Sequence, residues 1–160
     1  MIKDSIIKIL EEAKTAIINN IDSQGIKASG RTQKSLQVVD DGNHVMLISN
    51  GTGAPFTTLQ YGREAGKVPM KIRTILIQWI KDKNIQVEPI PYLTDRKHKY
   101  TPIQRGYMQR AYFIAKKIKE RGTGRHTTPN ENVYNDAIKQ AVSKINKTLL
   151  VEIKSIITDK

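Results

Sequence analysis

The chain has 160 residues, a formal net charge of +12 and no cysteine. This length predicts one domain with a real core, and the missing cysteines exclude disulfides, thiol catalysis and cysteine-ligated metal sites. No apolar run reaches the 18 or more residues of a membrane span, and acidic residues interrupt the N-terminal apolar pattern where a signal peptide would be uninterrupted. We therefore expect a soluble, intracellular domain over 1–160 that does not contact a membrane.

The N-terminal half combines one amphipathic helix with a hairpin. Apolar residues recur every three or four positions over 2–22, which predicts a helix that buries one stripe. Residues 35–39 and 44–49 are predicted strands, because Asp41-Gly42 between them favours a hairpin turn. A third extended segment is expected over about 55–61, where threonines and a tyrosine favour strand.

The C-terminal half is mostly helical. Apolar spacing predicts helices over about 72–84, 102–120 and 129–157, and prolines punctuate an irregular loop over 86–101. The last helix would extend about 40 Å, which is more than a domain of this size covers. Part of its apolar stripe is therefore expected to pack on another subunit, through Leu149, Ile153 and Ile156.

Together these elements indicate an α+β fold, in which a small antiparallel sheet packs with about four helices, including a long C-terminal helix. Residues 1–70 and 129–158 are expected to form the core of this single domain. A helical pair and its loop, over about 71–128, are expected to be inserted into that core.

Positive charge is concentrated in the second half of the chain. Residues 81–160 carry a net charge of +9, against +3 for residues 1–80, and the run from Arg96 to Arg125 contains ten basic residues and the single acid Glu120. Such a run attracts phosphate backbones, anionic lipid or an acidic protein surface, and it is also typical of a solvated basic face. The residues expected to contact a partner or phosphate are Arg96, Lys97, Lys99, Arg105, Arg110, Lys116, Lys117, Arg121 and Arg125.

Neither catalysis nor cofactor binding is expected. The three histidines match no metal-ligand spacing, and the adjacent Asp40 and Asp41 are explained by the turn. The glycine-rich segment 122–126 follows a helix and lacks the lysine–hydroxyl pair of a P-loop. We therefore expect no catalytic residue, no metal site and no cofactor, and no enzymatic activity.

Three tyrosines, Tyr100, Tyr107 and Tyr112, alternate with the basic residues, as in proteins that stack single-stranded bases. Tyr107 and Tyr112 also fall on the apolar side of the predicted 102–120 helix. Core tyrosines are therefore expected, with base stacking as the alternative.

Short motifs follow the leading helix in a characteristic order. Ser29-Gly30-Arg31 and Ser35-Leu36 precede the hairpin, and Leu59-Gln60-Tyr61-Gly62-Arg63 follows it. This order resembles the tail-completion and head–tail joining proteins of tailed bacteriophages, of the lambdoid tail-component type. In that family an acidic residue is usual where Gln60 stands here. Some members also carry an inserted helical pair, similar to 111–118 followed by Gly122-Thr123 and 133–136, so the resemblance extends over most of 25–145.

The resemblance implies a structural virion protein: a ring-forming subunit of the head–tail connector, neck or tail-completion assembly through which DNA passes. Its partners would be copies of itself in a homo-oligomeric ring, neighbouring portal or adaptor and tail proteins, and genomic DNA in non-specific contact. It would reside in the virion, and in the host cytoplasm during assembly.

The basic run then meets either DNA or acidic protein surfaces. Protein contacts are favoured, because tight binding of phosphates would hinder the passage of DNA. The alternative function is a basic nucleic-acid-binding protein that uses residues 96–125, which predicts tight and strongly salt-dependent binding.

Overall fold

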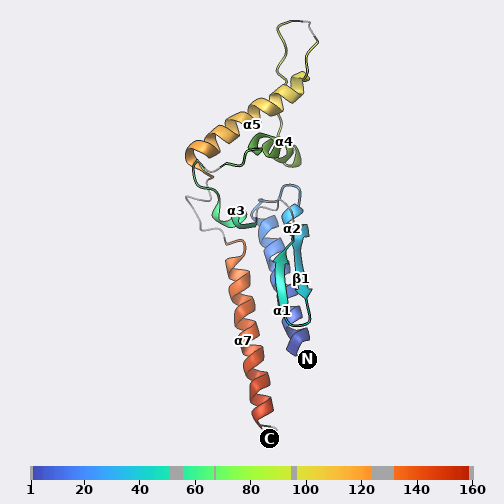
Figure 1. Cartoon of the computed structure of the whole chain (residues 1–160), viewed down its shortest axis with the longest axis vertical. Coiled ribbons are helices and arrows are strands. Elements are labelled where there is room, and N and C mark those ends of the chain that lie inside the picture. The colour runs from blue at the N-terminus through green and yellow to red at the C-terminus, as the bar shows by residue number, and fades with distance from the viewer. Residues whose placement is uncertain (1, 51–55, 67, 95–96, 124–131, 159–160) are drawn as a thin grey trace. The chain divides into compact units, whose positions relative to one another are not determined.

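The computed structural model describes residues 2–50, 56–66, 68–94, 97–123 and 132–158. Within these ranges the fold is α+β, with a two-stranded antiparallel sheet, six helices and a long C-terminal helix, which confirms the expected class (Figure 1). The sequence predicted four of these six helices, and the two that it did not predict are short. None of the described helices is long and apolar enough to cross a membrane.

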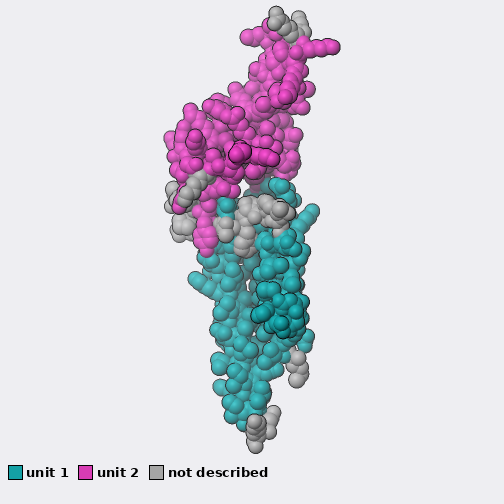
Figure 2. All heavy atoms as spheres, in the orientation of Figure 1, with its two compact units in different colours: residues 1–60, 129–160 teal, residues 61–128 magenta. Residues whose placement is uncertain are grey.

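The chain forms two compact units (Figure 2). Unit 1 consists of Met1–Gln60 and Pro129–Lys160, and unit 2 consists of Tyr61–Thr128. The boundary lies at residue 60, about ten residues before the one expected from the sequence.

Helix α1 (Ile2–Ser23) is the central element of unit 1, and the helix predicted over 2–22 is confirmed. Its inward stripe recurs at three- and four-residue steps, as an amphipathic helix requires, and comprises Ile9, Ala13, Ile17 and Ile21. Just beyond the helix, Gly25 adopts a φ of 62°, a left-handed conformation that glycine accepts without steric cost.

The hairpin packs on α1. Strands β1 (Leu36–Asp40) and β2 (Val45–Ser49) pair antiparallel in the register Val38↔Leu47, so both predicted strands are confirmed to within a residue. In the turn, Asp40 Oδ1 accepts the Gly42 N–H at 2.8 Å and Asp41 Oδ1 accepts the His44 N–H at 2.6 Å. The carboxylates of Asp40 and Asp41 therefore stabilise the turn by accepting hydrogen bonds from its backbone, as the sequence indicated.

Two short helices flank the hairpin where none was expected. Helix α2 (Arg31–Ser35) directly precedes β1, and helix α3 (Phe56–Tyr61) replaces the predicted third strand, which is wrong. Leu59 packs against the core and the neighbouring Gln60 is only 2% exposed. Consecutive residues of a strand point to opposite faces, whereas in a helix they are only about 100° apart and can both lie on the buried side. Position 55 lies outside the described residues.

Helix α7 (Asn135–Thr158) runs beside α1 in unit 1 (Figure 1). It begins at Asn135, later than the expected residue 129, and positions 129–131 lie outside the described residues. Val133 and Tyr134 are buried ahead of the helix, in the same core as Ile17 and Leu36. They therefore anchor the chain in the core before α7 starts.

Unit 2 is a helical pair. Helices α4 (Ile72–Asp82) and α5 (Pro102–Arg121), both predicted, pack through a core of Leu76, Ile80, Ala111 and Ala115. The described residues between them form neither helix nor strand, as expected for the loop. Tyr107 packs against this core, but Tyr112 is 43% exposed, so the expected core position of Tyr112 is wrong.

The two ends of unit 2 are tied to each other. The Arg63 N–H donates to Thr123 Oγ1 at 2.8 Å, the Thr123 N–H donates to the Arg63 carbonyl at 3.0 Å, and the Gly66 N–H donates to the Lys119 carbonyl at 2.7 Å. These bonds close unit 2 on itself, so that it begins and ends at neighbouring points, as an inserted element requires.

Candidate assembly and binding surfaces

The C-terminal helix α7 carries an apolar face that unit 1 leaves exposed. The residues that it buries in its contact with α1 are small, Ala137 and Ala141, and Ile145 packs against the cluster that contains Ala141, whereas most of the larger apolar residues are exposed. Of the three expected packing residues, Ile153 is 51% exposed, Ile156 is 61% exposed and Leu149 is half-buried. The last turns of α7 continue past the N-terminal end of α1 (Figure 1). Other exposed apolar residues of α7 are Ile138, Val142, Leu150, Val151 and Ile157.

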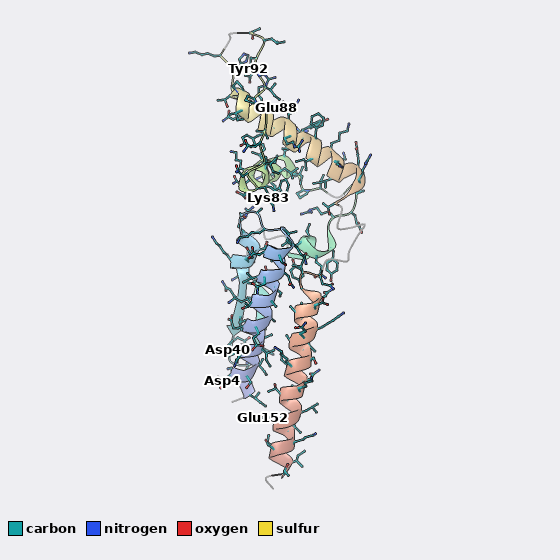
Figure 3. All side chains as sticks on the ribbon, turned by 180° about the vertical axis from the view of Figure 1, so that it is seen from behind. Asp4, Asp40, Lys83, Glu88, Tyr92 and Glu152 are labelled. Atoms are coloured by element: carbon teal, nitrogen blue, oxygen red, sulfur yellow. The ribbon has the colours of Figure 1, made fainter. Side chains whose placement is uncertain are left out.

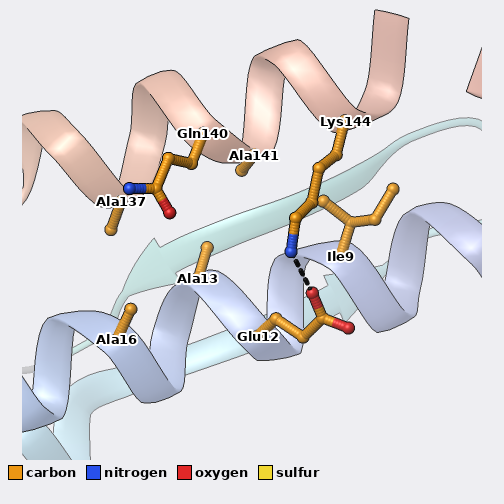
Figure 4. A pocket seen from close by; sticks show the side chains of 8 residues that line it. All are labelled: Ile9, Glu12, Ala13, Ala16, Ala137, Gln140, Ala141 and Lys144. Carbon is orange, nitrogen blue, oxygen red and sulfur yellow. Dashed lines mark hydrogen bonds and ion pairs between the residues drawn. The ribbon is translucent and has the colours of Figure 1, made fainter. Parts of the chain in front are cut away.

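A hollow of about 40 Å³ lies between α1 and α7 (Figure 4). Four alanines line much of it: Ala13 and Ala16 come from α1, and Ala137 and Ala141 come from α7. Sites for small-molecule ligands usually enclose about 300–1,000 Å³. This hollow therefore suits water molecules and is too small for a metabolite.

An ion pair bridges the two helices beside this hollow. Lys144 Nζ donates to Glu12 Oε2 at 2.6 Å (Figure 4). The hydrogen bond from the Lys144 ammonium, together with its positive charge, lowers the pKa of the Glu12 carboxyl below its ordinary value. The pair therefore favours the ionised carboxylate in the folded protein.

This ion pair makes the docking of α7 pH-dependent. Because folding lowers the pKa of Glu12, its contribution to stability is complete above the ordinary Glu pKa of about 4.3 and is lost as the pH falls through the folded value. We expect the Glu12→Gln variant to be slightly less stable than the wild type at pH 7 and equally stable at pH 3. Urea titrations followed by circular dichroism measure this difference, and an equal difference at both pH values would contradict the prediction.

Arg105 holds the long loop of unit 2 in place. Its Nη1 donates to the carbonyl oxygens of Ile90 at 3.1 Å and Pro91 at 2.7 Å, and its guanidinium lies 4.1 Å from the ring centroid of Tyr92. The Tyr92 ring in turn stacks on His98. Tyr92 and Glu88 both lie on this loop (Figure 3). Arg105 was expected to contact a partner or phosphate, but its side chain is engaged in the structure of the loop itself.

The loop also carries two of the other expected cations. Lys97 and Lys99 are exposed, and Lys99 Nζ lies 5.4 Å from the centroid of the Tyr100 ring. Arg96 and Arg125 lie outside the described residues.

The remaining expected cations lie on α5 and differ in their surroundings. Lys116 Nζ lies 3.9 Å from Glu120 Oε1, which partly neutralises it. Arg110, Lys117 and Arg121 are exposed, and no ion pair joins them to a carboxylate in the part of the chain that the structure describes. These three expected cations of α5 are therefore free to meet a partner.

One aromatic side chain beside these cations, Phe113, was not singled out from the sequence. Phe113 is 57% exposed, and its ring meets the edge of Tyr112 at a centroid distance of 5.6 Å. The guanidinium of Arg73, on α4, lies 5.0 Å from the Tyr112 ring centroid. The spacing of Phe113 from Arg110 was visible in the sequence, but the approach of Arg73 depends on how α4 and α5 pack.

Net charge is divided very unequally between the two units. Residues 61–128 contain sixteen Lys and Arg against five Asp and Glu, a net charge of +11, whereas the remaining residues have a net charge of +1. Unit 1 thus presents an apolar helix face, and unit 2 contains nearly all of the net positive charge.

Among the described residues, no group of three or more His, Asp or Glu side chains is placed to hold a metal ion. His44 and His98 lie in different units, in the hairpin turn and in the long loop. Comparisons of the chain with known protein families, with curated proteins and with solved structures found no match.

Proposed function

We propose that the chain is a ring-forming structural subunit of the head–tail connector, neck or tail-completion assembly of a tailed phage. The exposed apolar face of α7 carries this proposal, because Ile153 and Ile156 are each more than half exposed. Burying an Ile or Leu side chain completely stabilises by about 1.5–3 kcal/mol. Several such side chains along one helix therefore favour association, and the resemblance of the motifs to neck proteins supplies the phage context.

The outer face of the hairpin is the surface that this helix meets on the next copy. The pairs Val39↔Met46 and Gln37↔Ile48 lie on the opposite side of the sheet from Val38 and Leu36. Met46 is 40% exposed there. A two-stranded sheet also offers free backbone groups at its edges to a neighbour. Contact between α7 of one subunit and the hairpin of the next is head-to-tail, and a head-to-tail contact forms a ring when the rotation between copies closes.

The test compares the mass of variants by light scattering, with negative-stain imaging of the particles. The wild type is expected to form closed oligomers, and Ile153→Asp/Ile156→Asp to be monomeric, since a buried unpaired carboxylate weakens association by roughly 100-fold or more. Ser143→Asp adds the same charge at an exposed polar position of α7 and serves as the control. Unchanged circular dichroism would show that each variant is folded.

Mixing variants tests the head-to-tail geometry. Met46→Asp alone is also expected to be monomeric. A mixture of Met46→Asp with Ile153→Asp/Ile156→Asp restores one intact contact per pair, so dimers form but rings do not. A wild type that stays monomeric at 100 μM, alone and with portal or tail components, would overturn the proposed function.

A further inference from the structure

We infer that unit 2 binds single-stranded nucleic acid along one face of α5, a function separate from the assembly proposed for unit 1. Arg110, Phe113, Lys117 and Arg121 follow one another at steps of three or four residues. At 100° per residue they fall within an arc of about 80°, and they extend over about 17 Å of the helix. This set is called the α5 track.

The three cations of the α5 track have no neutralising neighbour among the described residues. Arg105 is engaged by the loop and Lys116 by Glu120, but Arg110, Lys117 and Arg121 are exposed without an ion pair. They belong to a unit whose sequence has a net charge of +11. Mutual repulsion of these charges is relieved by a polyanion, and releasing the counterions of the phosphates makes binding favourable.

The aromatic residue distinguishes a single strand from other polyanions. Phe113 is 57% exposed in the middle of the α5 track, where its ring gains little from the core of unit 2. Unpaired bases stack on exposed aromatic rings between cations, with about 1–3 kcal/mol per base. A duplex keeps its base faces inside the stack, and a strongly acidic protein surface offers few flat apolar groups on which such a ring can stack. The combination therefore favours single-stranded DNA or RNA over duplex DNA and over acidic proteins.

The experiment measures binding of the full chain to a fluorescent 20-nucleotide oligo-dT by anisotropy, over a series of salt concentrations. The charge variant is Arg110→Gln/Lys117→Gln/Arg121→Gln. Its control is Lys139→Gln/Lys147→Gln/Lys154→Gln, which removes the same charge from exposed positions of α7. The charge variant is expected to lose about 100-fold in affinity at 50 mM salt and to reduce the salt slope by about 2, whereas the control changes affinity by less than about 3-fold.

The aromatic contribution is tested separately. Phe113→Ala is expected to lose about 10-fold in affinity with an unchanged salt slope, and Phe113→Trp to retain wild-type affinity. The inference is overturned if the charge variant and its control behave alike, if Phe113→Ala binds as the wild type does, or if duplex DNA or polyglutamate displaces oligo-dT as well as unlabelled oligo-dT does. Because every substituted residue is exposed, circular dichroism of each variant is expected to match the wild type.

Discussion

Replacing Gln60 by Ala is expected to lower the free energy of unfolding by about 3 kcal/mol. Gln60 is 2% exposed, and its Oε1 accepts the backbone N–H of Tyr134 at 2.8 Å. Truncation leaves this buried N–H without its acceptor and opens a cavity between α3 and the residues that precede α7. Urea unfolding followed by circular dichroism measures the loss.

A second variant separates the hydrogen bond from the packing. Gln60→Met retains most of the side-chain volume but has no comparable acceptor, so we expect it to lose about 1–2 kcal/mol. Equal stability of Gln60→Met and the wild type would mean that the Tyr134 N–H does not depend on this acceptor.

Replacing Gly122 by Ala is expected to destabilise unit 2 by about 4 kcal/mol. Gly122 combines a φ of 72° with a ψ of −162°, a backbone conformation open essentially to glycine alone. A Cβ at this position would also collide with the backbone carbonyl oxygen of Arg63 and lie 3.1 Å from the Ala65 nitrogen. The substitution therefore strains the backbone and pushes apart the two tied ends of unit 2.

Gly66→Ala is the matched control in the same unit. Gly66 has a φ of 79°, but no atom lies within 4 Å of an added Cβ, so the cost is confined to the backbone, about 1–2 kcal/mol. Trp79 is the single tryptophan of the chain and packs in the α4–α5 core, so its fluorescence reports the unfolding of unit 2. If the two variants unfold at the same urea concentration, the collision with Arg63 is not significant.

Local patterns were sufficient to predict the long elements. Helices α1, α4 and α5 each show an apolar stripe at helical spacing, and the hairpin turn is specified by Asp41-Gly42. The surplus apolar stripe of α7 was also visible, because helix length and apolar spacing are both properties of a short stretch of sequence.

The elements that the sequence did not predict depend on distant contacts. Residues 56–61 have a weak preference for strand, and the need to bury Leu59 and Gln60 together overrides it. Likewise, the buried position of Tyr134 ahead of α7 depends on its bond with Gln60, 74 residues away in the chain. Propensity over a few residues contains no information about such partners.

The sequence by itself determined the α+β class, the long helices and the excess of positive charge. Only the tertiary structure decided which charges are available: Arg105 is engaged with Ile90 and Pro91, whereas Arg110, Lys117 and Arg121 are left exposed on α5. The physical reason is that charge and periodicity are sums over neighbouring residues. The availability of a side chain depends instead on which backbone and carboxylate groups the packing of the helices brings within a few ångströms of it.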